Sequence, residues 1–175
     1  MAKVGPMTER EEALTMNRKM LAVGSGMAMI LGASMAASGA SATPPSSPAP
    51  AASESVVGVL EGPARARADG IKLKVRRDTA VRSVKLTYPV GSFSGWHQHP
   101  GIVIAVVESG TVQRKVGCKS ETFKAGDAFT EVAPHFVRNV GKVPAVLRIT
   151  QLYPASITDL SELREDRPAP TCRKK

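Results

Sequence analysis

Apolar and polar positions alternate in short segments over much of the chain. Apolar and basic residues alternate over 71–76, and the same period of two recurs over 84–88, as in half-buried strands. Unbroken apolar runs follow at 102–107 and 145–147. Glycines separate these runs at turn-like intervals, and past residue 55 a helical turn is indicated at 161–166 alone. Many short strands with glycine turns predict an all-β sandwich or barrel.

The N-terminal part has a different pattern. Residues 20–53 contain no charged side chain, and they follow a basic pair at 18–19. A basic flank, a short apolar run and a small-residue site at 40–42 are typical of a secretory signal peptide. We therefore predict a signal peptide over 1–42 and a secreted, extracytoplasmic protein. Met16 is an alternative start, and membrane anchoring by an uncleaved N-terminal segment is the alternative fate.

Composition then divides the rest of the chain. A Pro/Ser/Ala tract at 43–55 lacks apolar periodicity, which predicts an extended linker. The folded domain is predicted at 56–160, and 161–175 forms a C-terminal tail. The whole chain has 175 residues, with 42% apolar and 22% charged residues. These values fit one folded domain and exclude both a wholly disordered chain and a polytopic membrane protein.

The three histidines lie in two short segments. His97 and His99 are two residues apart, so on a strand their side chains would point to the same side. His135 comes from a later segment and could complete a face of three nitrogens for a divalent metal. The alternative is that these are ordinary polar histidines of the core or the surface.

The residues around these histidines resemble the two motifs of the cupin superfamily, over roughly 84–150. The first motif is carried by Gly91, His97, His99 and Gly110, and the second by Gly126, Asp127, Pro134, His135 and Asn139. The resemblance implies a double-stranded β-helix, which is a barrel of the jelly-roll type. It also implies that His97, His99 and His135 hold a metal inside the barrel.

Two departures from the family pattern affect this expectation. The family usually has Glu at the place of Val103, so the carboxylate ligand of the first motif is missing. In the second motif Pro134 directly precedes His135, which makes the orientation of that imidazole the least secure of the three. Glu131 could face inward as a further ligand or as a base beside the metal, or it could be exposed at a strand end. Glu108 falls on the opposite face and is expected to be solvated.

The resemblance implies a function in outline. A divalent metal ion, with iron, manganese, nickel, copper and zinc undecided, would bind inside the barrel together with a small-molecule ligand or substrate. Similar three-histidine cupins include dioxygenases that act on thiols or diketones, so an exported dioxygenase-type oxidoreductase is one hypothesis. A non-catalytic module that binds or senses a small molecule is the alternative, and no catalytic residue is assigned. Cupins often dimerise, which makes a homodimer a further expectation.

Aromatic residues are concentrated in the predicted barrel. Phe93, Phe129, Phe136 and Tyr88 would form an apolar pocket or plain core packing. Trp96 has the opposite parity to His97, which places it on the outer face or at the rim.

The two cysteines, Cys118 and Cys172, are predicted to form one disulfide, since an exported chain with two cysteines favours a pair.

The basic charge is concentrated at 64–77, with six basic residues and one Asp, in a chain of formal net charge +9. For an exported protein the partners of such a stripe would be anionic envelope polymers or lipid headgroups. A solvated face without a partner is the alternative. Nucleic acid is not indicated, because no aromatic residue is interleaved for base stacking.

Overall fold

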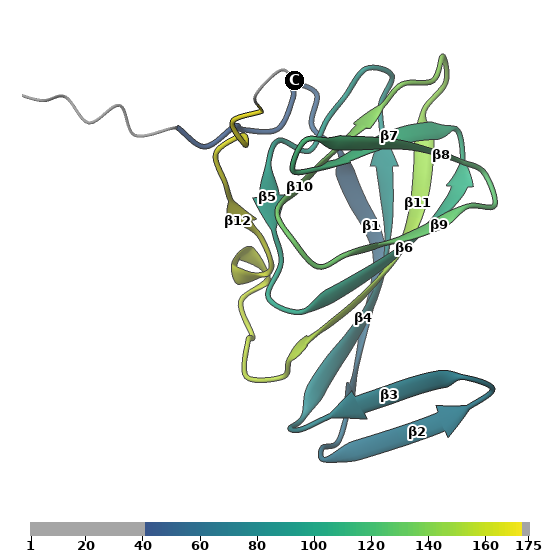
Figure 1. Cartoon of the computed structure of the whole chain (residues 1–175), viewed down its shortest axis with the longest axis vertical. Coiled ribbons are helices and arrows are strands. Elements are labelled where there is room, and N and C mark those ends of the chain that lie inside the picture. Colours follow the sequence, from purple (N-terminus) through teal and green to yellow (C-terminus); the bar gives the residue numbers. More distant parts are fainter. Residues whose placement is uncertain (1–40, 173–175) are drawn as a thin grey trace, which may run out of the picture. The chain divides into compact units, whose positions relative to one another are not determined.

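A computed structural model describes residues 41–172 of the chain (Figure 1). Over these residues the chain forms two five-stranded sheets, which face each other, and one separate two-stranded hairpin. The predicted all-β, double-stranded β-helix architecture is confirmed. Residues 1–40, which hold most of the predicted signal peptide, lie outside the described residues. No helix among those described is both long enough and apolar enough to cross a membrane.

The strands of the first sheet are β1 (Ala51–Leu60), β4 (Thr79–Tyr88), β6 (Ile102–Ser109), β9 (Ala128–Glu131) and β11 (Ala145–Pro154). Their order in the sheet is β1-β4-β11-β6-β9. The strands of the second sheet are β5 (His97–Gln98), β7 (Thr111–Val116), β8 (Lys119–Lys124), β10 (His135–Asn139) and β12 (Glu165–Asp166). Their order is β12-β5-β10-β7-β8. The hairpin consists of β2 (Ala64–Ala68) and β3 (Ile71–Val75), and a short 3₁₀ helix, η1, spans Leu160–Leu163.

The core lies between the two sheets. Along β6, Val103, Ala105 and Val107 are buried, whereas the residues between them are exposed. Strand β11 alternates in the same way, with Leu147 and Ile149 directed inward. Side chains at every second position of both strands therefore fill one cluster, as the period of two requires.

The tract predicted as a linker is part of the fold. Residues 51–55 form the first half of β1, which pairs with β4. Before them, the amide of Ser46 donates to the carbonyl of Phe93 at 3.0 Å, and the amide of Phe93 donates back to Ser46 Oγ at 2.8 Å. The structure thus differs from the prediction of an extended linker over 43–55. The tract has no apolar period because it is held through its backbone and through small residues.

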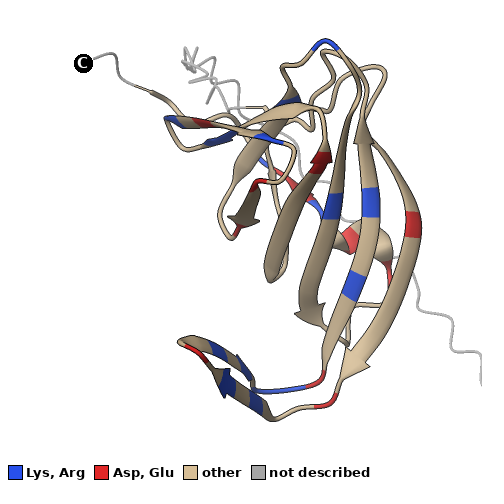
Figure 2. Cartoon of the chain, turned by 90° about the vertical axis from the view of Figure 1, so that its right-hand side faces the viewer, with Lys and Arg blue, Asp and Glu red and all other residues tan. Residues whose placement is uncertain are grey.

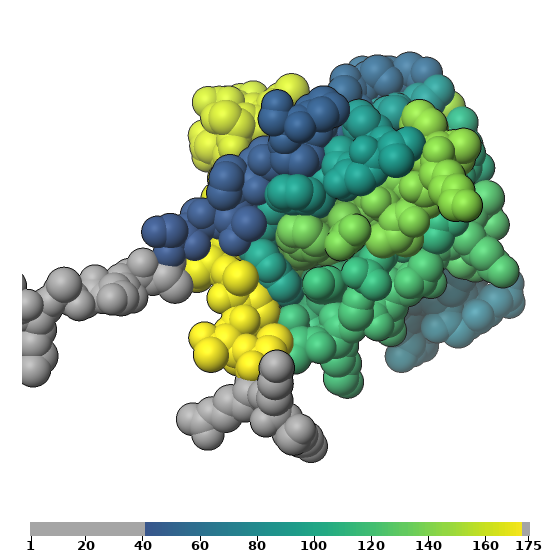
Figure 3. All heavy atoms as spheres, turned by 90° about the horizontal axis from the view of Figure 1, so that it is seen from above, coloured from purple at the N-terminus to yellow at the C-terminus, as the bar shows by residue number. Residues whose placement is uncertain are grey.

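One glycine allows the N-terminal segment to approach this closely. Gly95 has a positive φ of 71°, and a Cβ there would lie 2.2 Å from the carbonyl oxygen of Thr43. Thr43 in turn donates its amide to the carbonyl of Arg167 at 3.3 Å. The first described residues therefore lie beside the C-terminal segment, as Figure 3 shows in dark blue and yellow.

The hairpin β2–β3 differs from its prediction. The alternation over 71–76 indicated a strand buried on one face, but Ile71 is 74% exposed and Leu73 is 39% exposed. The strands pair with each other alone, through a turn in which Asp69 and Gly70 both have positive φ. This geometry is that of a two-residue hairpin turn, which Asp-Gly favours. The hairpin projects from the barrel without a third strand to cover it (Figure 1).

The C-terminal residues complete the second sheet instead of forming a separate tail. Strand β12 pairs with β5, and η1 lies at the helical turn indicated at 161–166. Cys172 is disulfide-bonded to Cys118 in the turn between β7 and β8, so the predicted disulfide is present in the structure. It closes a loop with a sequence separation of 54 residues.

Removing this disulfide should lower the stability of the domain. In the chain-entropy model, a loop of this length stabilises the folded state by about 4 kcal/mol. We expect a Cys118→Ser/Cys172→Ser variant to unfold at lower urea concentration, with a loss of free energy of unfolding up to about that size. Wild-type protein treated with a reductant should match the variant. Equal stability of oxidised, reduced and substituted protein would contradict the prediction.

Candidate metal centre

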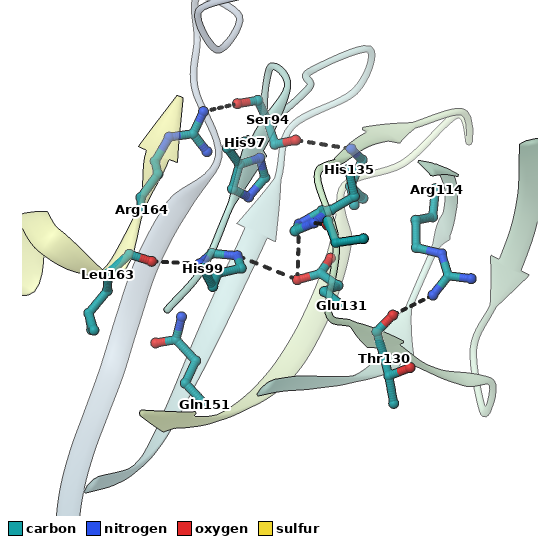
Figure 4. A network of polar contacts seen from close by, with 12 residues as sticks. Ser94, His97, His99, Arg114, Thr130, Glu131, His135, Gln151, Leu163 and Arg164 are labelled. Atoms are coloured by element: carbon teal, nitrogen blue, oxygen red, sulfur yellow. Dashed lines mark hydrogen bonds and ion pairs between the residues drawn. The ribbon is translucent and has the colours of Figure 1, made fainter. Parts of the chain in front are cut away.

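Two neighbouring strands bring the histidines together. His97 on β5 and His135 on β10 are direct partners in the antiparallel register, so their side chains point to the same face. Their ring centroids lie 4.3 Å apart. His99 follows β5 by one residue, and its ring centroid lies 4.9 Å from that of His97 and 5.3 Å from that of His135. The predicted convergence of the three imidazoles is therefore present in the structure (Figure 4).

Backbone carbonyls fix the orientation of every ring. The Nδ1 atoms of His97, His99 and His135 lie 3.0, 2.6 and 2.8 Å from the carbonyl oxygens of Gly95, Leu163 and Ala133, respectively. A carbonyl can accept a hydrogen bond but cannot donate one, so each neutral ring must carry its proton on Nδ1. The three Nε2 atoms are then unprotonated, and metal-binding histidines are commonly oriented in this way.

These histidines fit a metal ion. One ligand atom from each ring can be chosen so that all three lie within 4.8 Å of one another. His135 is 1% exposed, and among the described residues its Nε2 is a buried polar atom without a hydrogen-bond partner. A buried acceptor costs free energy when it is left unpaired. A divalent cation between the rings would satisfy it.

A carboxylate lies on the same face. Glu131 is 7% exposed, and its Oε2 lies 3.2 Å from His135 Nε2 and 3.6 Å from His99 Nε2. Glu131 lies on β9 and pairs directly with Val103 on the neighbouring strand β6. Val103 is also buried. A carboxylate on the adjacent strand therefore lies next to the position at which the first motif lacks one. Glu108, by contrast, is exposed and pairs with Arg148, as its parity indicates.

The charges of these groups depend on burial and on one another. Burial is the largest cause that lowers the pKa of His97, to about 3, and repulsion from His135, Arg164 and His99 acts in the same direction whenever the two neighbouring rings are protonated. Burial by itself would raise the pKa of Glu131, but His135 and His99, when their Nε2 atoms carry a proton and donate to the carboxylate, outweigh it and hold that pKa below its usual range. The site therefore combines a neutral imidazole with an ionised carboxylate.

The histidine face borders a cavity of about 270 Å³, which suits a small molecule. Part of its wall is apolar and comes from the first sheet. These residues are Val84, Leu86, Tyr88, Val103, Leu147 and Ile149. The N-terminal tract adds Pro45, Ala49, Pro50 and Ala52 to the lining.

Two cavity residues were missed in the sequence. Arg82 and Gln151 both line the cavity, and Arg82 donates from Nη1 to Gln151 Oε1 at 2.7 Å. Arg82 also donates from Nε to Ser55 Oγ at 2.9 Å. The signal was present, because extending the alternation at 84–88 back by two residues places Arg82 on the inward face of β4.

The aromatic residues divide between the two sides of the second sheet. Tyr88 lines the cavity, and Phe129 belongs to the core. Phe93 stacks on Phe136 with ring centroids 5.4 Å apart, and Trp96 contacts Phe136 at 6.0 Å. Trp96 does not border the histidine cavity, in agreement with its parity, but it is buried instead of exposed at a rim. Trp96 and the C-terminal residues that the disulfide holds line the same surface pocket.

Residues 84–151 match the family model described as a cupin domain. These residues form a cupin domain. Asn139 of the second cupin motif is buried and structural, because its side-chain amide donates to the carbonyls of Tyr88 at 3.0 Å and Val143 at 2.8 Å. His135 points inward although the second cupin motif departs from the usual pattern.

Solved structures of similar proteins include the cupin domain of Cnp3 from Schizosaccharomyces pombe, with 14% identity and a TM-score of 0.39. That match covers 44% of this cupin chain and 58% of the other chain. A predicted oxalate decarboxylase from Thermotoga maritima has 18% identity and a TM-score of 0.38, covering 45% and 83%. An uncharacterized protein with a double-stranded β-helix domain from Klebsiella pneumoniae has 20% identity and a TM-score of 0.41, covering 49% and 73%. Comparison with curated proteins finds no match.

The position of the carboxylate can be tested by moving it. Glu131→Gln should weaken binding of Mn²⁺ or Zn²⁺ by about 10- to 100-fold, because the ionised group beside two imidazoles is lost. His99→Ala should weaken it further, since one of three ligands is removed. A Val103→Glu/Glu131→Gln variant carries the carboxylate on β6 instead of β9, and its metal affinity should recover in part. Titration against a competing chelator measures these affinities.

Glu61→Gln is the matched control, because this exposed carboxylate lies in the connection between β1 and β2. It should leave metal affinity unchanged. The assignment fails if Glu131→Gln binds metal as tightly as wild type, or if the double variant is no better than Glu131→Gln alone.

Proposed function

We propose that this cupin binds a divalent transition metal through His97, His99 and His135 and carries out a dioxygenase-type oxidation of a small anionic molecule. The observation that carries the proposal is the convergence of three Nε2 atoms beside a cavity, with each ring held by a backbone carbonyl. Three protein ligands leave coordination positions open, as catalytic metal sites require. When bound, the metal would supply Lewis-acid and redox chemistry.

The cavity favours an anionic ligand. Arg82 lines it, and the ion pairs found among residues 41–172 do not include this guanidinium. Its hydrogen bonds to Gln151 and Ser55 hold it in place without neutralising its charge. A guanidinium pairs well with a carboxylate, which it can bind through two parallel hydrogen bonds. The apolar wall would accept the remainder of the molecule.

Glu131 favours catalysis over simple binding. It is buried beside the imidazoles, so its carboxylate oxygen is placed to accept a hydrogen bond or a proton from a ligand that approaches the metal face. The alternative function is a non-catalytic module that binds or senses a small molecule. Such a module would use the same metal and the same Arg82 but would need no base.

The function can be tested on protein loaded separately with iron, manganese, nickel, copper or zinc. Oxygen uptake would be followed while small carboxylates, thiols and diketones are supplied. We expect one metal to support turnover of a carboxylate-bearing compound, and Arg82→Gln to raise its KM more than it lowers kcat, because the guanidinium binds the part that does not react.

The exposed variant Arg138→Gln is the control and should leave both constants unchanged. Ligand binding without oxygen uptake under any metal would favour the binding module. Failure to take up any of the five metals at neutral pH would contradict the metal centre itself.

Export remains part of the proposal. The support is the uncharged run at 20–53 behind a basic pair, together with the small-residue site at 40–42. N-terminal sequencing of protein recovered outside the producing cell should begin at Thr43 or within a few residues of it. Retention of residues 1–30 on the exported protein would contradict signal-peptide cleavage.

A further inference from the structure

The hairpin β2–β3 has one cationic face and one apolar face. In its antiparallel register, direct partners share a face. Arg65 pairs with Lys74, and Arg67 pairs with Lys72, so all four cations lie on one face. The other face carries Ala64, Ala66, Ala68, Ile71, Leu73 and Val75. Figure 2 shows the basic positions as blue bands along this projecting hairpin.

Each face carries a free-energy cost that a partner could reduce. Like charges placed directly across a strand pair repel each other, and here two such pairs adjoin. On the other face, Ile71 and Leu73 expose large apolar side chains. A two-stranded hairpin without further packing is marginally stable. A partner that supplies both anions and an apolar medium would relieve both costs.

We propose that this hairpin docks onto a lipid surface that carries anionic headgroups. In such an interface the apolar face enters the boundary of the acyl chains, while the long Lys and Arg side chains extend around the edges of the ribbon to the phosphates. Charge complementarity favours this occupant over a second copy, because the segment at 64–77 carries six basic residues against one acidic residue. A soluble polyanion would neutralise the cations but leave the apolar face in water.

The proposal is independent of the metal site. Among the described residues, the lining of the cavity includes no residue of the hairpin β2–β3. Docking would therefore hold the barrel at the membrane surface while its cavity stays available, and failure of either proposal leaves the other unaffected.

The test is co-sedimentation of the full chain with vesicles of phosphatidylcholine alone or with 30 mol% phosphatidylglycerol. We expect binding to the anionic vesicles that weakens as salt is raised. Each basic residue near an anionic surface contributes about a fivefold factor in partitioning, so replacing Arg65, Arg67, Lys72 and Lys74 by Gln should reduce binding by at least about tenfold. Ile71→Ser/Leu73→Ser should also reduce it severalfold, because the apolar contact is lost.

A matched control replaces four exposed cations of the barrel region by Gln, namely Lys119, Lys124, Arg138 and Lys142. This variant has the same net charge as the hairpin charge variant and should retain most of the binding. Since every variant keeps residues 1–42, differences between them report on the hairpin. Circular dichroism and metal affinity should be unchanged in all of them.

Three results would overturn the proposal. Equal losses in the two charge variants would show a general effect of net charge. Unchanged vesicle binding of Ile71→Ser/Leu73→Ser would show that the hairpin recognises negative charge alone. A soluble polyanion could then replace the lipid surface. A dimer in light scattering without vesicles that is abolished by Ile71→Ser/Leu73→Ser would assign the apolar face to a second copy of the chain.

Discussion

Each imidazole at the cavity donates its Nδ1 hydrogen to a backbone carbonyl, and the chemistry of the site depends on this constraint. The acceptor of His99 is the carbonyl of Leu163, 64 residues away in η1. The C-terminal segment thus orients one of the three nitrogens, although it supplies no ligand. The buried side chain of Leu163 packs with Ala80 and Tyr153 and so holds this carbonyl in place, and displacement of the segment would free the ring to rotate.

The same constraint explains why a carboxylate suits the site. Three unprotonated Nε2 atoms and the Glu131 carboxylate are all hydrogen-bond acceptors, so without a shared cation or proton they repel one another. Glu131 lies beside His99 and His135, on the strand next to the position that usually provides it in cupins. A negative charge beside the imidazoles thus comes from β9 and not from the first motif.

Sequence reasoning reached the barrel and the three histidines because alternation and His-x-His spacing are local signals. The sequence leaves open whether the side chain of Glu131 faces inward, since its direction depends on how β9 pairs with β6. The packing of the tract at 43–55 leaves no signal in the sequence, because it uses backbone hydrogen bonds and small side chains, which give no apolar period. At 71–76 the alternation was read correctly as a strand, yet no pattern in one strand tells whether another layer covers it.

Pro45, Ala49, Pro50 and Ala52 form part of the cavity wall, and they follow the predicted cleavage site within ten residues. The exact point at which a protease trims the chain would therefore set the dimensions of the binding site. A cut after residue 42 keeps the whole wall, whereas a cut after residue 50 removes three of its four members. Two forms with identical barrels and identical histidines would then differ in which molecules they admit. If the predicted cleavage occurs, the position of the new chain end would influence which ligands the cavity admits.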